Sequence, residues 1–135
     1  MIVVDANVII AALLENDHFH VRSRDWLGEY LLAGGQLIAP VILLTEVGGG
    51  IARRTSDLQG TRAVQVLRNL SSLKLQQVTN KLALEATQLA IDLRLRGADA
   101  LYVAVALRSN VPLVSWDREH LERAGRRITV YQPQA

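Results

Sequence analysis

Four acidic residues lie within or directly beside apolar segments of this 135-residue chain. They are Asp5 in MIVVDANVII, Glu46 in APVILLTEV, Asp99 in GADALYVAVA and Asp117 after PLVSW. An ionised carboxylate is costly to bury unless hydrogen bonds or positive charge compensate for the lost water. Each acid alone could be a cap at the end of a strand or helix. Four caps within four apolar segments would be a coincidence, so we interpret the four acids as one site.

A cluster of four carboxylates favours a bound metal ion. Neighbouring carboxylates repel one another and raise one another's pKa, which a divalent cation would relieve. Mg²⁺ and Mn²⁺ prefer oxygen ligands and need neither histidine nor cysteine, and this chain has no cysteine. Such an ion lowers the pKa of a bound water and neutralises charge on a reacting phosphodiester. The acids therefore predict metal-dependent phosphodiester hydrolysis, with one or two ions and with Glu46 either ligating metal or orienting the attacking water.

The segments that carry these acids predict an α/β fold. Short apolar segments alternate with helical ones, which is typical of a parallel sheet covered on both faces. The predicted strands are 2–5, 37–39, 75–78, 112–115 and 128–131. The predicted helices are 8–15, 21–33, 41–54, 58–73, 82–95, 98–108 (apolar nearly all round, hence buried) and 117–124. Ligands bind beyond the carboxyl ends of such strands, so all four acids can reach the same edge.

Length and composition fit one cytoplasmic domain. Half of the residues are hydrophobic, which allows a substantial core. The absence of cysteine fits a reducing compartment, no segment resembles a signal peptide, and no apolar run reaches the roughly 18 residues of a membrane span. Lys74 and Lys81 are the only lysines among 15 basic residues. The excess of arginine favours phosphate binding, although a GC-rich gene would produce the same bias.

The segments VVDANVII, LLTEV, GADALYVAVAL and PLVSWD, in this order, resemble the four motifs of PIN domains. The short chain is similar to the VapC toxins of toxin–antitoxin pairs. This resemblance implies a three-layer α/β/α sandwich with a central parallel sheet, forming a single nuclease domain over residues 1–135. It further implies a Mg²⁺- or Mn²⁺-dependent endoribonuclease, usually a homodimer, with an RNA substrate, a cognate antitoxin protein and products ending in 5′-phosphate and 3′-hydroxyl.

Matched motif by motif, the resemblance implies an acidic catalytic and metal-binding set of Asp5, Glu46, Asp99 and Asp117. Asn7 matches an asparagine that would order the loop beside the first acid. Ser115 matches a serine or threonine whose hydroxyl would bind a carboxylate or a metal-bound water. The chain departs from the family at Gly48-Gly49-Gly50, where glycines should weaken the helix that carries Glu46. It also has no further acid within SWD, so the site would rest on four acids.

Other residues with chemical potential have plainer interpretations. Arg53, Arg54 and Arg62 are candidates to hold the RNA backbone, or they form a solvated helix face. His18 and His20 are two residues apart, a spacing that does not face one way on a helix, and we expect a capping or surface role. We expect His120 to be exposed. Trp116 either packs beside the site or contacts substrate.

Two other protein classes with carboxylates at a sheet edge fit poorly. A phosphoacceptor receiver domain needs a lysine after a late strand and a pair of acids after the first, but Ala6 and Asn7 follow Asp5. A phosphatase with an Asp-x-Asp motif fails because Asn7 occupies the second position. Two alternatives remain open: a PIN nuclease that processes RNA without being a toxin, and a non-catalytic PIN-like module for RNA binding or assembly.

Overall fold

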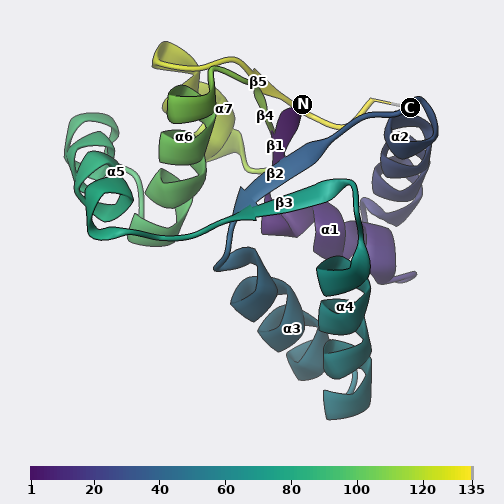
Figure 1. Cartoon of the computed structure of the whole chain (residues 1–135). Coiled ribbons are helices and arrows are strands. Elements are labelled where there is room, and N and C mark those ends of the chain that lie inside the picture. Colours follow the sequence, from purple (N-terminus) through teal and green to yellow (C-terminus); the bar gives the residue numbers. More distant parts are fainter. Residues whose placement is uncertain (135) are drawn as a thin grey trace.

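One parallel sheet of five strands forms the centre of the molecule (Figure 1). The computed structural model describes residues 1–134. The strands are β1 (Ile2–Val4), β2 (Leu37–Pro40), β3 (Leu73–Gln76), β4 (Leu113–Val114) and β5 (Val130–Tyr131), in the order β3-β2-β1-β4-β5. Because β1 is central and pairs with β2 and β4, its carboxyl end opens at the middle of the sheet.

Helices cover both faces of the sheet, which confirms the predicted three-layer α/β/α sandwich with a central parallel sheet. They are α1 (Ala6–Leu13), α2 (His20–Leu32), α3 (Leu43–Arg54), α4 (Asp57–Asn69), α5 (Asn80–Leu93), α6 (Gly97–Ser109) and α7 (Arg118–Glu122), followed by the 3₁₀ turn η1 (Ala124–Arg126). In Figure 1, α5 and α6 lie together on one side of the sheet, and α3 and α4 lie side by side on the other. Over residues 1–134, no helix has the length and apolar character needed to cross a membrane.

The apolar pattern identified the buried elements correctly. All three residues of β1 are buried, and α6 is buried along most of its length, as its nearly continuous apolar sequence predicts. The boundaries around β3 were predicted wrongly. The preceding helix ends at Asn69, and the strand begins at Leu73, two residues before its predicted start. Pairing with β2 sets this register, since Leu37 lies opposite Leu73, and the local sequence does not contain that information.

The three glycines after Glu46 do not interrupt α3. They allow close packing instead. A Cβ atom at Gly48 would lie 2.8 Å from Val64 of α4, and one at Gly50 would lie 2.9 Å from Ile10 of α1. Across the same contact, a Cβ at Gly60 of α4 would lie 2.7 Å from the Gly48 carbonyl oxygen. The intrinsic cost of glycine in the helix is therefore offset by the close approach of its neighbours.

Candidate active site

The four acids line a single cavity of about 460 Å³ at the carboxyl ends of the central strands. Asp5 directly follows β1, and Asp117 lies three residues after β4. Glu46 is in the first turns of α3, which follows β2, and Asp99 is in the first turn of α6. The rest of the lining consists of Ala6, Asn7, Ile10, Asp17, Thr45, Arg53 and Arg54. The fold thus brings together acids from four separate segments of the chain.

Asp5 is 6% exposed, and protein donors surround one of its oxygens. Its Oδ2 accepts a hydrogen bond from Ser115 Oγ at 2.8 Å and a longer one from Asn7 Nδ2 at 3.5 Å. The Asn7 amide also donates to Ser115 Oγ at 3.2 Å, and its Oδ1 accepts from the Trp116 backbone N–H. Ser115 Oγ in turn accepts from the Asp117 N–H. This network compensates in part for burying the carboxylate and joins the end of β1 to the end of β4.

Glu46 is held by Tyr102, a residue that the sequence analysis did not identify. The wholly buried Tyr102 hydroxyl donates to Glu46 Oε1 at 2.6 Å. Burial and the adjacent Glu46 carboxylate raise the pKa of Tyr102 far above its ordinary value, so the hydroxyl stays protonated and remains a donor. Burial, with the charges of Asp5 and Asp99, also raises the pKa of Glu46, while the Tyr102 hydrogen bond lowers it in part. The only sequence signal was a polar-tipped side chain three residues after Asp99 in an otherwise apolar helix.

Asp99 shows the repulsion expected within an acidic cluster. Burial raises its pKa, and the charges of Asp5 and Asp117 add to the rise. His120 and Arg96 oppose it, and Arg96 Nε lies 3.5 Å from Asp99 Oδ2. Since Arg96 is largely exposed, water screens much of that compensation. A cation in the cavity would relieve the repulsion more effectively.

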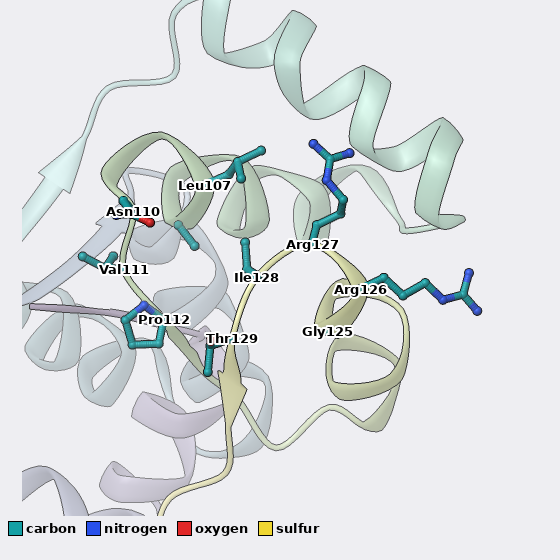
Figure 2. Close-up of a pocket in the computed structure, with 10 residues that line it drawn as sticks. Leu107, Asn110, Val111, Pro112, Gly125, Arg126, Arg127, Ile128 and Thr129 are labelled. Carbon is teal, nitrogen blue, oxygen red and sulfur yellow. The ribbon is translucent and has the colours of Figure 1, made fainter.

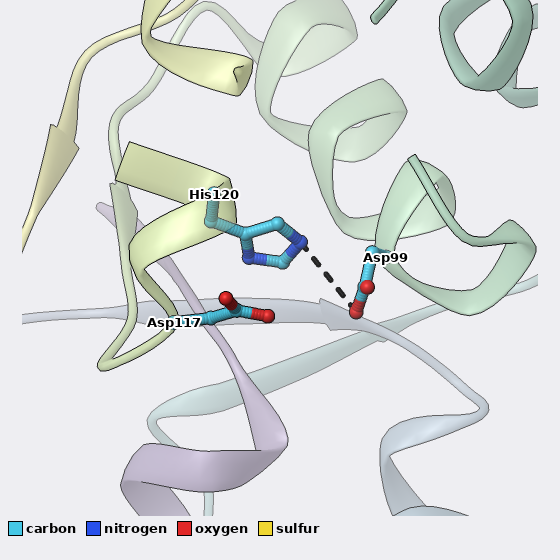
Figure 3. A group of neighbouring side chains, drawn as sticks. All are labelled: Asp99, Asp117 and His120. Carbon is cyan, nitrogen blue, oxygen red and sulfur yellow. Dashed lines mark ion pairs between the residues drawn. The ribbon is translucent and has the colours of Figure 1, made fainter. Parts of the chain in front are cut away.

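The prediction that His120 is exposed was wrong, because α7 packs its ring completely inside the protein. Nδ1 of His120 lies 2.9 Å from Asp5 Oδ2. Nε2 lies 3.5 Å from Asp99 Oδ1, the ion pair that Figure 3 marks. Within residues 1–134, neither nitrogen forms a well-aligned hydrogen bond. Burial by itself lowers the pKa of His120, but the contact with Asp5 and the charges of Asp99 and Asp117 outweigh burial and raise it.

Asp117 caps a helix, as the plainer interpretation predicts, and it also lines the cavity. Its Oδ1 accepts from the Glu119 backbone N–H at 2.8 Å at the start of α7. Asp99, Asp117 and His120 each offer a ligand atom, and these atoms lie within 4.8 Å of one another (Figure 3). This spacing is compatible with a shared metal ion.

The chain matches the PIN domain family over residues 2–126. It belongs to the PIN-domain family. No curated protein sequence matches the chain significantly.

Solved structures share this PIN fold over nearly the whole chain. VapC20 of Mycobacterium tuberculosis, described as a sarcin-ricin loop cleaving toxin, has a TM-score of 0.78 at 16% identity, covering 96% of this chain and 97% of VapC20. VapBC2 from Rickettsia felis, solved with a fragment of promoter DNA, gives a TM-score of 0.75 at 17% identity. The alignment covers 99% of this chain and 100% of the Rickettsia chain. FitAcB from Neisseria gonorrhoeae gives a TM-score of 0.74 at 20% identity, and the alignment covers 98% of each chain. Because the sequence identities are only 16–20%, the structural similarity establishes a shared fold and nothing further.

Of the three candidate arginines in this PIN domain, Arg53 and Arg54 line the acidic cavity and Arg62 does not. Arg54 also contacts Asp17 at 3.4 Å. Trp116 is 8% exposed, and its ring stacks on Phe19 with the centroids 4.1 Å apart. The Trp116 indole therefore packs beside the site and braces the segment between α1 and α2.

A separate cavity of about 410 Å³ lies where the chain enters β4 and β5 (Figure 2). It is lined by Ala106, Leu107, Asn110, Val111, Pro112, Gly125, Arg126, Arg127, Ile128 and Thr129. None of these residues is an acid or a histidine, and Arg126 extends away from the other labelled side chains (Figure 2). Because Pro112 precedes β4, this cavity is at the amino ends of the strands, away from the acids.

Proposed function

We propose that this chain is a Mg²⁺- or Mn²⁺-dependent endoribonuclease, folded as a single nuclease domain, that acts as the toxin of a type II toxin–antitoxin system. One observation carries the proposal: four carboxylates from four segments line one cavity. Membership of the PIN-domain family and the shared fold with VapC20 support it.

The donor set fits a hard divalent cation. Each of three acids has one oxygen held by the protein: Asp5 Oδ2, Glu46 Oε1 and Asp117 Oδ1. The second oxygen of each, Asp5 Oδ1, Glu46 Oε2 and Asp117 Oδ2, takes part in no hydrogen bond or ion pair with the described residues. Carboxylate oxygens that remain free beside a polar cavity are the ligands that Mg²⁺ and Mn²⁺ prefer.

In the proposed mechanism, Asp5, Asp99 and Asp117 would hold the metal. When bound, a divalent ion would supply Lewis-acid chemistry, lowering the pKa of a water and neutralising charge on the phosphodiester. Glu46 either completes the ligand set or accepts a hydrogen bond from the attacking water at Oε2, while Tyr102 fixes its Oε1. Hydrolysis then leaves a 5′-phosphate and a 3′-hydroxyl.

Residues beside the four acids would act on substrate position and on the first acid. Ser115 and Asn7 hold Asp5 by its Oδ2 atom, which restricts the orientation of its Oδ1 atom. Arg53 and Arg54 bring positive charge to the same cavity, where guanidinium groups would pair with the phosphates of a bound RNA.

The toxin assignment rests on the structural neighbours. VapBC2 and FitAcB are similar to this chain over nearly its full length. A protein from Klebsiella pneumoniae whose structure is a toxin–antitoxin complex is also similar, with a TM-score of 0.72 at 16% identity. By analogy, we propose a cognate antitoxin protein as a partner, a homodimer as the assembly and the cytoplasm as the location.

Mn²⁺ binding by calorimetry, together with RNA cleavage, tests the proposal. Asp5→Asn and Asp99→Asn should lose most of the binding heat and the cleavage. Asp92→Asn is the matched control, because Asp92 is exposed on α5 and outside the cavity. Total cellular RNA is the first substrate, with new 5′-phosphate ends mapped by sequencing. Wild-type protein that binds no Mn²⁺ would contradict the proposal and favour a non-catalytic role in RNA binding or assembly.

A further inference from the structure

We propose that His120, which lies outside the cavity lining, is a positioning residue that holds Asp5 and Asp99 in a fixed relative orientation. The inference rests on the proposed function and assigns a role to a residue outside the four acids.

The first support is the place of the ring. His120 is fully buried and is not part of the cavity lining, whereas Asp5 and Asp99 both line the cavity. The imidazole therefore contacts these carboxylates without itself lining the cavity that substrate and metal would occupy. One nitrogen of His120 does lie within 4.8 Å of carboxylate oxygens of Asp99 and Asp117, but the ring is fully buried and does not line the cavity, so we assign His120 to positioning rather than ligation.

The second support is the pairing of the two nitrogens with two different elements. Nδ1 contacts Asp5 at the end of β1, at 2.9 Å, and Nε2 contacts Asp99 at the start of α6, at 3.5 Å. One planar ring thus spans two acids that no direct hydrogen bond joins within residues 1–134. Carboxylates with like charge would otherwise separate, and ligand groups must be held to within about 0.5 Å for productive geometry.

The third support is the cost of the arrangement. A buried ring whose nitrogens have no well-aligned hydrogen bond is an exception to the rule that buried polar groups are satisfied. An apolar side chain would fill the same space beneath α7 without that cost. The Asp5 Oδ2 atom that His120 contacts is also the one held by Ser115, so both contacts fall on the same oxygen, and Oδ1 has no protein partner among the described residues.

Three substitutions separate the two contacts. His120→Asn keeps a side-chain nitrogen near the position of Nδ1 and preserves the Asp5 contact. His120→Gln reaches toward the position of Nε2 and preserves the Asp99 contact. His120→Leu removes both. His20→Asn is the matched control, because His20 Nδ1 lies 2.8 Å from the Ala11 carbonyl oxygen and contacts none of the four acids.

Two measurements test the role. In metal-free protein, the ¹⁵N resonance of His120 Nδ1 should shift in Asp5→Asn and stay unchanged in Asp92→Asn. In the metal-binding assay, His120→Leu should raise the Mn²⁺ dissociation constant about 10–100-fold, the range typical of residues that orient metal ligands. We expect His120→Asn and His120→Gln to fall between His120→Leu and wild type, and His20→Asn to match wild type. The Asn and Gln variants keep the test valid if His120→Leu does not fold.

Each contrary result has a distinct meaning. An unshifted Nδ1 resonance overturns the contact itself. Wild-type affinity in all three His120 variants overturns the positioning role while leaving the proposed function intact. A directly coordinated nitrogen in the electron spin echo spectrum of bound Mn²⁺ overturns it in favour of ligation. If wild type binds no Mn²⁺, the proposed function fails, and the role of His120 fails with it even where the Nδ1 contact is seen.

Discussion

Replacing Tyr102 by phenylalanine isolates one hydrogen bond to the candidate site. The substitution removes only the hydroxyl that donates to Glu46 Oε1 at 2.6 Å, and the ring keeps its packing in α6. Hydrogen bonds to charged groups contribute about 1.5–3 kcal/mol, and the partial exposure of Glu46 favours the lower end because water can replace the donor. We therefore expect the ionised form of Glu46 to lose about 1.5 kcal/mol of stabilisation and its pKa to rise further above the ordinary value.

The direction of this shift follows from the contacts. Tyr102 lowers the pKa of Glu46 against the effect of burial, so its loss moves the pKa further above the ordinary value. Carbon-13 NMR of the Glu46 carboxyl group as a function of pH measures the shift without requiring a substrate. Tyr30→Phe is the matched control, because its hydroxyl donates to the Gln36 carbonyl at 2.9 Å, outside the cavity. A Glu46 titration that is the same in Tyr102→Phe as in wild type would refute the reasoning.

Three further predictions address stability and metal affinity. Ser115→Ala should weaken Mn²⁺ binding about 10–100-fold in calorimetry while the fold persists, because Asp5 Oδ2 loses its shortest hydrogen bond; unchanged affinity would contradict this. Gly60→Ala should destabilise the protein by about 1–3 kcal/mol in denaturant unfolding, because its Cβ would meet the Gly48 carbonyl oxygen. Gly28→Ala is the control: its Cβ would point into open space, so the substitution should stabilise α2 by up to about 1 kcal/mol. Equal effects at the two glycines would refute the packing argument. Because the folded-state pKa values of Glu46, Asp99 and His120 are all raised, the folded metal-free protein binds more protons than the unfolded chain, and its stability should fall as pH rises from about 5 to 8. Thermal unfolding should show a shallower fall in Glu46→Gln, and an equal slope would argue against this linkage.

The sequence predicted the sheet because its central strands are strongly apolar. β1, β2 and β4 are buried throughout and read as short apolar runs. β3 is an edge strand that pairs only with β2 and is partly exposed, with LKLQ as its sequence. Its weak apolar signal explains why its boundaries were misplaced by two residues. Tertiary pairing, rather than local preference, determines where such a strand begins.

The site was only partly visible in the sequence, for a related physical reason. An acid inside an apolar segment is unusual, and that contrast made Asp5 and Asp99 recognisable as candidates. Tyr102 in an apolar helix looks like an ordinary core residue, and His120 in DREHLERA looks like a surface residue. The Tyr102–Glu46 and His120–Asp5 contacts join positions 56 residues or more apart in the chain, so only the folded structure reveals them.

The arrangement suggests why the cluster tolerates its own repulsion. One oxygen of each of three acids accepts from a different kind of donor: a serine hydroxyl on Asp5 Oδ2, a tyrosine hydroxyl on Glu46 Oε1 and a backbone N–H on Asp117 Oδ1. These donors belong to the protein and stabilise the ionised form of each acid. Within residues 1–134, the other oxygens of Asp5, Glu46 and Asp117 have no protein partners, and the charges of neighbouring acids still raise the pKa values of Glu46 and Asp99. The fold therefore compensates enough charge to remain stable, and it leaves an excess of negative charge in the one place where a divalent cation would neutralise it.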